Sequence, residues 1–273
     1  MPFKAAGNWV TTFSKVLLNG PPMSTKTKSL LTFPRPLHAL GVPGEEGMST
    51  LMHDPEAGVH VYTWEDDKDV QGQVLKVASP QEKWQAMNRW IVDLAAGTYG
   101  PVATAAVDGA HKIYDLLKLV RNWSVDLEDR GKTSSALHAD FTNFVSKFLG
   151  APFPQKVVCC FDGVEQEQGS TVKEVFPGLY GKMSKEVLGY FPVVFHTRRK
   201  PNPVKYVWEL EPSGTMQGAG MHVPEHIRRL FPKEIEIVVD ASPEGLKLQR
   251  VTGGWQAVQA ILAKAAEGAQ KGA

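Results

Sequence analysis

The sequence predicts an α/β fold in which helices flank a mostly parallel central sheet. Short apolar runs that suit buried strands alternate with segments of helical spacing, as in repeated strand–helix units. In the run KVVCCFDG (156–163), apolar residues follow Lys156 without interruption up to Phe161, which is typical of a strand buried on both faces. Hydrophobic residues make up 42% of the chain and charged residues 22%, so we expect a folded core.

The elements follow in order along the chain. The expected strands are KVLLNG (15–20), LHALGV (37–42), VHVYTW (59–64), VATAAV (102–107), KVVCCFDG (156–163), YFPVVFHTRR (190–199) and KYVWELEP (205–212). The last two form a C-terminal hairpin region around residues 200–203. One helix is expected directly after the turn that ends at Thr27. Further helices are expected at residues 80–96, 112–123, 136–150 and 254–270.

The second helix carries its own start and stop signals. Ser79 suits the N-cap, Pro80 the first helical position and Gly97 the residue past the end. Trp84 and Trp90 lie on its apolar stripe, so we interpret them as core residues rather than as base-stacking residues, and the same holds for Trp64 and Trp123. The glycine-containing stretch 169–189 is expected to be a loop.

Length and composition favour one core with appendages. We divide the chain into an N-terminal extension (1–14), a core (15–240) and a C-terminal helical tail (241–273). The 30 basic and 29 acidic residues nearly balance, so contact with nucleic acid would need a local patch. The two cysteines are adjacent and suit a reducing interior. No signal peptide or membrane-spanning run is recognisable, so a cytoplasmic protein without membrane contact is expected.

A phosphate-binding loop is predicted between the first strand and its helix. That pattern places a lysine and a hydroxyl residue behind a turn whose N–H groups wrap phosphates, and Gly20, Lys26 and Thr27 fit it. Thr25 stands where the pattern has a second glycine. The alternative is a polar loop before an ordinary helix. The expected nucleotide-binding residues are Gly20, Pro21, Pro22, Met23, Ser24, Thr25, Lys26, Thr27 and Lys28.

Acidic residues near the ends of two strands complete the expected site. Asp108 ends the run VATAAV, where its carboxylate can hold Mg²⁺ beside Thr27. Glu45 or Glu46, after LHALGV, is placed to orient an attacking water, although both also suit a solvated loop. The eight histidines show no spacing typical of a zinc site.

Three segments in this order, GPPMSTKTKSLLTFPRPLHAL, AVDGAHKIYDLL and KVVCCFDGVEQ, resemble phage RecA-like P-loop ATPases related to the Sak-type single-strand annealing and recombination proteins. The resemblance covers about residues 15–239 and implies a RecA-like core. It implies that ATP and Mg²⁺ are cofactors, with phosphate on Lys26 and the metal on Thr27 and Asp108. It further implies that Glu45 or Glu46 activates the water that attacks ATP.

The resemblance also implies roles farther along the chain. Glu165 or Gln166 would sense the γ-phosphate. A homo-oligomeric ring or filament, single-stranded DNA, and an annealing or single-strand binding protein are the implied partners, in the host cytoplasm if a phage encodes the protein. Arg198, Arg199 or Lys200 is available to complete a neighbouring subunit's site or to contact DNA. The run HTRRK is equally compatible with a solvated hairpin tip.

Three functions remain open at this point. The first is an ATPase that acts on single-stranded DNA in recombination, annealing or replication. The second is a nucleotide-binding structural or adaptor protein with little or no hydrolysis, an interpretation that Thr25 supports. The third is a small kinase, although no arginine-rich lid follows the core.

Overall fold

The computed structural model describes most of the chain. The described residues are 13–43, 47–52, 58–63, 67–68, 74–76, 78–121, 130–166, 173–179, 183–201, 203–211, 219–240 and 250–271. Glu45 and Glu46, together with Trp64 and Trp123, lie outside them.

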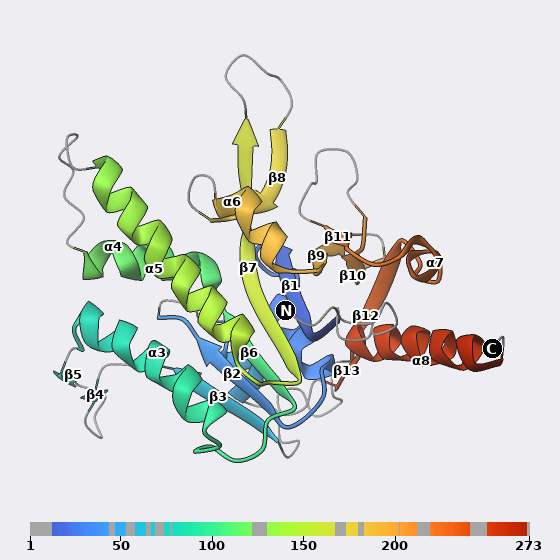
Figure 1. Ribbon diagram of the computed structural model, residues 1–273, viewed down its shortest axis with the longest axis horizontal. Coiled ribbons are helices and arrows are strands. Elements are labelled where there is room, and N and C mark those ends of the chain that lie inside the picture. Colours follow the sequence, from blue (N-terminus) through green and yellow to red (C-terminus); the bar gives the residue numbers. More distant parts are fainter. Residues whose placement is uncertain are drawn as a thin grey trace, which may run out of the picture.

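A large mixed sheet runs through the molecule (Figure 1). Its main strands are β1 (Lys15–Gly20), β2 (Leu37–Gly41), β3 (Val59–Thr63), β6 (Thr104–Asp108), β7 (Gln155–Gln166), β9 (Val193–Lys200), β10 (Lys205–Glu209), β12 (Glu234–Asp240) and β13 (Arg250–Gly253). Their spatial order is β13-β12-β10-β9-β1-β7-β6-β2-β3. Two shorter strands, β8 (Lys173–Pro177) and β11 (Gly220–Met221), pair with β7 and β9, and β4 (Asp67–Lys68) pairs with β5 (Val74–Lys76) in a separate small sheet.

The neighbouring strands β9, β1, β7, β6, β2 and β3 of the sheet are parallel to one another. This arrangement determines where a ligand site can form. β1 lies between β7 and β9 and is parallel to both, and β7 is in turn parallel to β6. The carboxyl ends of these strands therefore meet at one edge of the sheet. In open α/β sheets ligands bind outside this edge.

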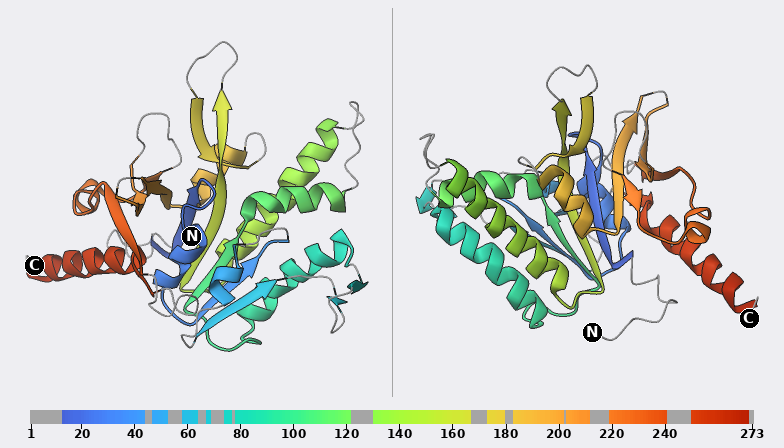
Figure 2. Two further views of the ribbon diagram at one scale, coloured as in Figure 1. Left: turned by 180° about the vertical axis from the view of Figure 1, so that it is seen from behind. Right: turned by 45° about the horizontal axis from the view of Figure 1, so that its top comes forward.

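Helices cover both faces of the sheet (Figure 2). One face is covered by α3 (Pro80–Ala95), α4 (Ala110–Val120), α5 (Arg130–Gly150), α6 (Met183–Glu186) and η3 (Val187–Tyr190). The other is covered by α1 (Lys26–Ser29), η2 (Leu30–Thr32), α2 (Ser49–Met52) and α8 (Trp255–Lys271). Successive strand residues alternate between the two cores: Leu17 packs with the first set and Leu18 with the second. The mostly parallel α/β fold predicted from the sequence is confirmed.

The antiparallel strands β10, β12 and β13 extend the sheet beyond β9. The sheet thus continues past residue 240 to Gly253, and Trp255 at the start of α8 is buried in the core behind β1. The short α7 (Glu225–Arg228) precedes β12. Ion pairs link side chains over this part of the sheet: Lys200 on β9 with Glu234 on β12, and Lys205 on β10 with Glu236 on β12.

The predicted loop at 169–189 is wrong for its described part. Lys173–Pro177 forms β8, which pairs with the extension of β7, and Met183–Tyr190 forms two short helical turns. Phe176 and Met183 are buried, so apolar side chains anchor a stretch whose glycines and charges suggested a loop. Figure 1 shows the β7–β8 hairpin standing beyond the sheet.

Other local predictions are confirmed. Trp90 is buried, Trp84 packs against the same core, and both cysteines are buried and not joined in a disulfide. The strands 193–200 and 205–209 form the expected hairpin. Within the described part of the chain, no helix combines the length and apolar character needed to span a membrane.

The capping box predicts a measurable stability effect. Ser79 Oγ accepts a hydrogen bond from the Glu82 N–H at 3.2 Å, and Glu82 Oε2 accepts one from the Ser79 N–H at 2.8 Å. We expect Ser79→Ala to lower the free energy of unfolding by about 1 kcal/mol because a helix N–H loses its partner. Urea denaturation measures this loss. Ser79→Asp keeps an acceptor and should stay close to the wild type, so an equal loss in both variants would contradict the capping argument.

Candidate functional site

The turn from β1 into α1 packs closely against β9. A Cβ on Gly20 would lie 2.4 Å from the carbonyl oxygen of Thr197 and 2.1 Å from its hydroxyl. That hydroxyl donates to the Asn19 carbonyl at 3.1 Å and lies 2.6 Å from Ser24 Oγ. Glycine is therefore required at position 20 by the close approach of the neighbouring strand.

Lys26 is folded onto the loop that precedes it. Its ammonium group donates to the carbonyls of Gly20 and Pro21, both at 2.7 Å, and lies 4.4 Å from the centre of the Phe161 ring. Burial lowers the pKa of Lys26, and the nearby Cys159, Asp108 and Asp162 partly oppose that shift. A buried cation held by carbonyl dipoles is suited to exchange those contacts for phosphate oxygens.

Thr27 and Asp108 meet at the same edge. The Thr27 hydroxyl donates to Asp108 Oδ2 at 2.5 Å, although the two residues lie far apart in the sequence. Asp108 is buried at the end of β6, next to β7 in the sheet. A hydroxyl and a carboxylate are oxygen ligands of the kind that Mg²⁺ prefers, so these two residues could hold a magnesium ion.

Two loop residues other than glycine have left-handed backbones. Met23 has φ of 60° and Thr25 has φ of 70°, and Thr25 directly precedes α1. Thr25 is therefore in the conformation that glycine adopts freely at the corresponding position of the P-loop pattern. The loop keeps this backbone shape despite the substitution, at a cost in conformational energy.

We expect Thr25→Gly to stabilise the protein by about 1 kcal/mol. The left-handed conformation costs a residue with a Cβ roughly 1–2 kcal/mol, and the greater freedom of glycine in the unfolded chain offsets part of the gain. Thermal and urea unfolding measure the change. Thr25→Ala keeps the Cβ and is the matched control, so equal stabilisation by alanine would contradict the strain argument.

The remaining predicted residues are placed at varying distances from the loop. Gly20 pairs with Phe161, so the backbone of Gln166 lies about 16 Å farther along β7, on the β7–β8 hairpin with Glu165. Arg198, Arg199 and Lys200 are the last three residues of β9, at the loop edge. Arg198 and Lys200 pair with carboxylates of Glu209 and Glu234. The roles of these residues stay predictions.

Sequence reasoning missed a buried charged cluster at the same edge. His196 on β9 contacts Asp162 on β7 at 3.0 Å and Glu209 on β10 at 2.8 Å. Burial alone would lower the pKa of His196, but hydrogen bonds and charges from both carboxylates outweigh it and raise the pKa to about 9. The signal available in the sequence was a histidine within the apolar run VVFHT and an aspartate after KVVCCF.

His111 is the second missed residue. Its ring stacks on Phe161 with centroids 4.1 Å apart, and its Nδ1 accepts a hydrogen bond from the Phe161 N–H at 3.4 Å. Burial, assisted by the positive charges of Lys112 and Lys26, lowers the pKa of His111 to about 4. His111 is therefore neutral and packs against the Phe161 ring. The Lys26 ammonium group lies near the same ring.

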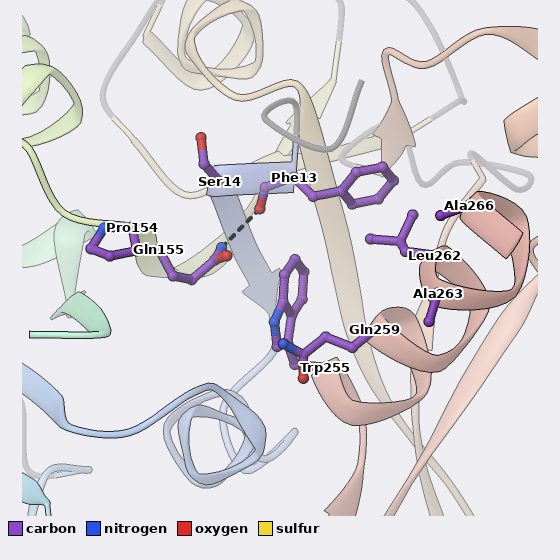
Figure 3. Close-up of a pocket in the computed structure, with 9 residues that line it drawn as sticks. All are labelled: Phe13, Ser14, Pro154, Gln155, Trp255, Gln259, Leu262, Ala263 and Ala266. Carbon is purple, nitrogen blue, oxygen red and sulfur yellow. Dashed lines mark hydrogen bonds between the residues drawn. The ribbon is translucent and has the colours of Figure 1, made fainter. Parts of the chain in front are cut away.

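A cavity of about 550 Å³ lies away from this site (Figure 3). Phe13, Trp255 and Leu262 supply much of its apolar lining, and Gln155 at the start of β7 donates to the Phe13 carbonyl at 2.9 Å. Because the parallel strands begin here, the cavity is at the edge opposite the Lys26 loop. It contributes nothing to the site at Lys26.

Comparisons with known proteins give a fold likeness only. No protein-family model matches the chain, and no curated protein matches it. Among solved structures, it is similar to one described as a prototypical ATPase from the type III secretion system of pathogenic bacteria, with 12% sequence identity and a TM-score of 0.43. The match covers 68% of this chain and 51% of that one, so this chain spans about half the length of its structural neighbour.

Proposed function

We propose that the protein binds ATP with Mg²⁺ at the loop of residues 20–28 and hydrolyses it. The observation that carries this proposal is the joint placement of Lys26, Thr27 and Asp108 at the carboxyl edge of a parallel sheet. Lys26 would hold the β- and γ-phosphates, and Thr27 and Asp108 would hold the metal. Magnesium, when bound, would neutralise charge on the phosphate oxygens.

Each residue of the loop then has a defined task. Gly20 allows the loop to pass beside β9, and Lys26 exchanges its carbonyl contacts for phosphate oxygens. The Thr27 hydroxyl and the Asp108 carboxylate are already held together by a hydrogen bond. Little rearrangement is therefore needed to present both oxygens to a cation.

Calorimetric titration with Mg-ATP tests the proposal. We expect Lys26→Ala to weaken binding by at least about 100-fold, which corresponds to about 2.7 kcal/mol. Lys118→Ala is the control, because Lys118 pairs with Asp115 on the surface of α4 and should leave binding unchanged. No binding by the wild-type protein, or equal affinity in Lys26→Ala, would refute the assignment.

We further propose that the protein is a homo-oligomer that acts on single-stranded DNA as it hydrolyses ATP. The process would be recombination, annealing or replication. This part rests on the resemblance of the sequence to the phage ATPases and on the basic run 198–200 at the loop edge. Hydrolysis that rises on addition of single-stranded DNA, and is lost in Lys26→Ala, would support it. Arg199→Ala should reduce the stimulation if this edge contacts DNA.

A second candidate function is a structural switch that holds ATP without turnover. The left-handed Thr25 favours it, because a side chain occupies the position where the pattern has glycine beside phosphate. Tight Mg-ATP binding with no hydrolysis, with or without DNA, would favour this function. Recovery of hydrolysis in Thr25→Gly would identify the side chain as the cause.

A further inference from the structure

A chain of charged side chains bridges three strands beside the Lys26 loop. The His196 ring lies between the carboxylates of Asp162 and Glu209, and Arg198 contacts the second oxygen of Glu209 at 3.2 Å. The exposed fractions of the three central side chains are 8% for His196, 14% for Asp162 and 8% for Glu209. Charges this enclosed are stabilised mainly by their partners, because water screens them little. Removing one partner leaves the other charge uncompensated.

The bridge crosses over the strand that leads into the loop. Asn19 pairs in register with Cys160 on β7 and with His196 on β9, so β1 lies between the bridged strands. Asp162 follows Phe161, the residue that pairs with Gly20. The contact from His196 to Asp162 therefore spans β1 where that strand turns into the loop.

Lys26 contacts the residue that precedes Asp162. Its ammonium group lies 4.4 Å from the centre of the Phe161 ring, and Asp162 is the next residue along β7. The Asp162 carboxylate is also one of the negative groups that favour the charged form of the Lys26 ammonium, which raises the pKa of Lys26. Asp162 Oδ2 contacts His196, whereas Oδ1 is buried and has no hydrogen-bond partner among the described residues. Among the described residues, the hydrogen bond from His196 is thus what fixes the position of the Asp162 carboxylate.

We infer that His196 is a positioning residue that holds Asp162 away from Lys26 and so keeps the lysine available to phosphate. Without the imidazolium, Asp162 is an enclosed carboxylate with no ion-pair partner, and the Lys26 ammonium is a cation close to it. An ion pair between the two competes with phosphate for the same ammonium group. The inference rests on the proposed function for its effect on ATP, but not for its effect on Lys26.

Two substitutions and their combination test the inference through ATP affinity. We expect His196→Gln, which removes the positive charge, to weaken Mg-ATP binding about 10-fold, or about 1.4 kcal/mol. Adding Asp162→Asn removes the competing carboxylate and should return the affinity to within about threefold of the wild type. His138→Gln removes a histidine–carboxylate contact with Glu186 and is the matched control. A double variant as weak as His196→Gln would overturn the inference.

A second measurement does not depend on ATP. A crystal structure of His196→Gln reports the position of the Asp162 carboxylate directly, with His138→Gln as the control. We expect the Asp162 carboxylate to lie within hydrogen-bond distance of Lys26 Nζ in His196→Gln, because the enclosed carboxylate has lost its partner, and to keep its present place in the control. An Asp162 carboxylate that does not approach Lys26 in His196→Gln would overturn the inference. If the wild type binds no ATP, this structure still decides it, and only the proposed function fails.

Discussion

Replacing Gly20 by alanine is expected to destabilise the protein by about 3 kcal/mol, at the upper end for overpacking of a core. The new methyl group would lie 2.4 Å from the Thr197 carbonyl oxygen, a backbone atom that moves only if β9 moves. It would also lie 2.1 Å from the Thr197 hydroxyl, which holds Ser24 of the loop. Stability and loop geometry should therefore be lost together.

Urea denaturation measures the stability of Gly20→Ala. Gly150→Ala is the matched control, because a Cβ at Gly150, the last residue of α5, would meet nothing within 4 Å. We expect the control to be neutral or slightly stabilising, since alanine favours helix over glycine. A loss below about 1 kcal/mol in Gly20→Ala would mean that β9 yields to the loop.

The charged cluster at His196 predicts the second large effect, a loss of stability in alkaline solution. The pKa of His196 is raised in the folded protein from 6.5 to about 9, a shift that corresponds to on the order of 3 kcal/mol. Because the folded value exceeds the unfolded one, this contribution is complete below about pH 6.5. It declines as the pH rises and is lost above about pH 9.

Glu209 determines where the stabilisation by the same cluster is lost in acidic solution. Its hydrogen bond to His196 lowers the pKa of Glu209 below 4.5, so its contribution is present above that pH and lost as the pH falls. The cluster therefore stabilises the fold most between about pH 4.5 and 6.5.

Unfolding free energies of the wild type and His196→Gln at pH 6, 8 and 9.5 measure the alkaline effect. The wild type should lose stability over this range, and the variant should lose much less. Parallel pH profiles for the two proteins would show that His196 is not the titrating group.

Local patterns in the sequence were sufficient for much of the fold. The runs KVLLNG, LHALGV and KVVCCFDG form parallel strands, and the capping signals at Ser79 and Gly97 mark the ends of α3. These elements are predictable because short apolar runs and helix caps are signals that act over a few neighbouring residues. The phosphate-binding loop after the first strand is predicted from the same kind of local signal, since Gly20, Lys26 and Thr27 have the spacing of the pattern.

The tertiary structure alone decided which distant residues share the site. It placed Asp108 against Thr27, and it also brought Asp162, His196 and Glu209 together across β1. Such contacts depend on strand order and register, and a polar residue in an apolar run carries no sign of its future neighbours. The same holds for the left-handed backbone of Thr25, which packing and hydrogen bonds of the surrounding loop impose against the preference of the residue.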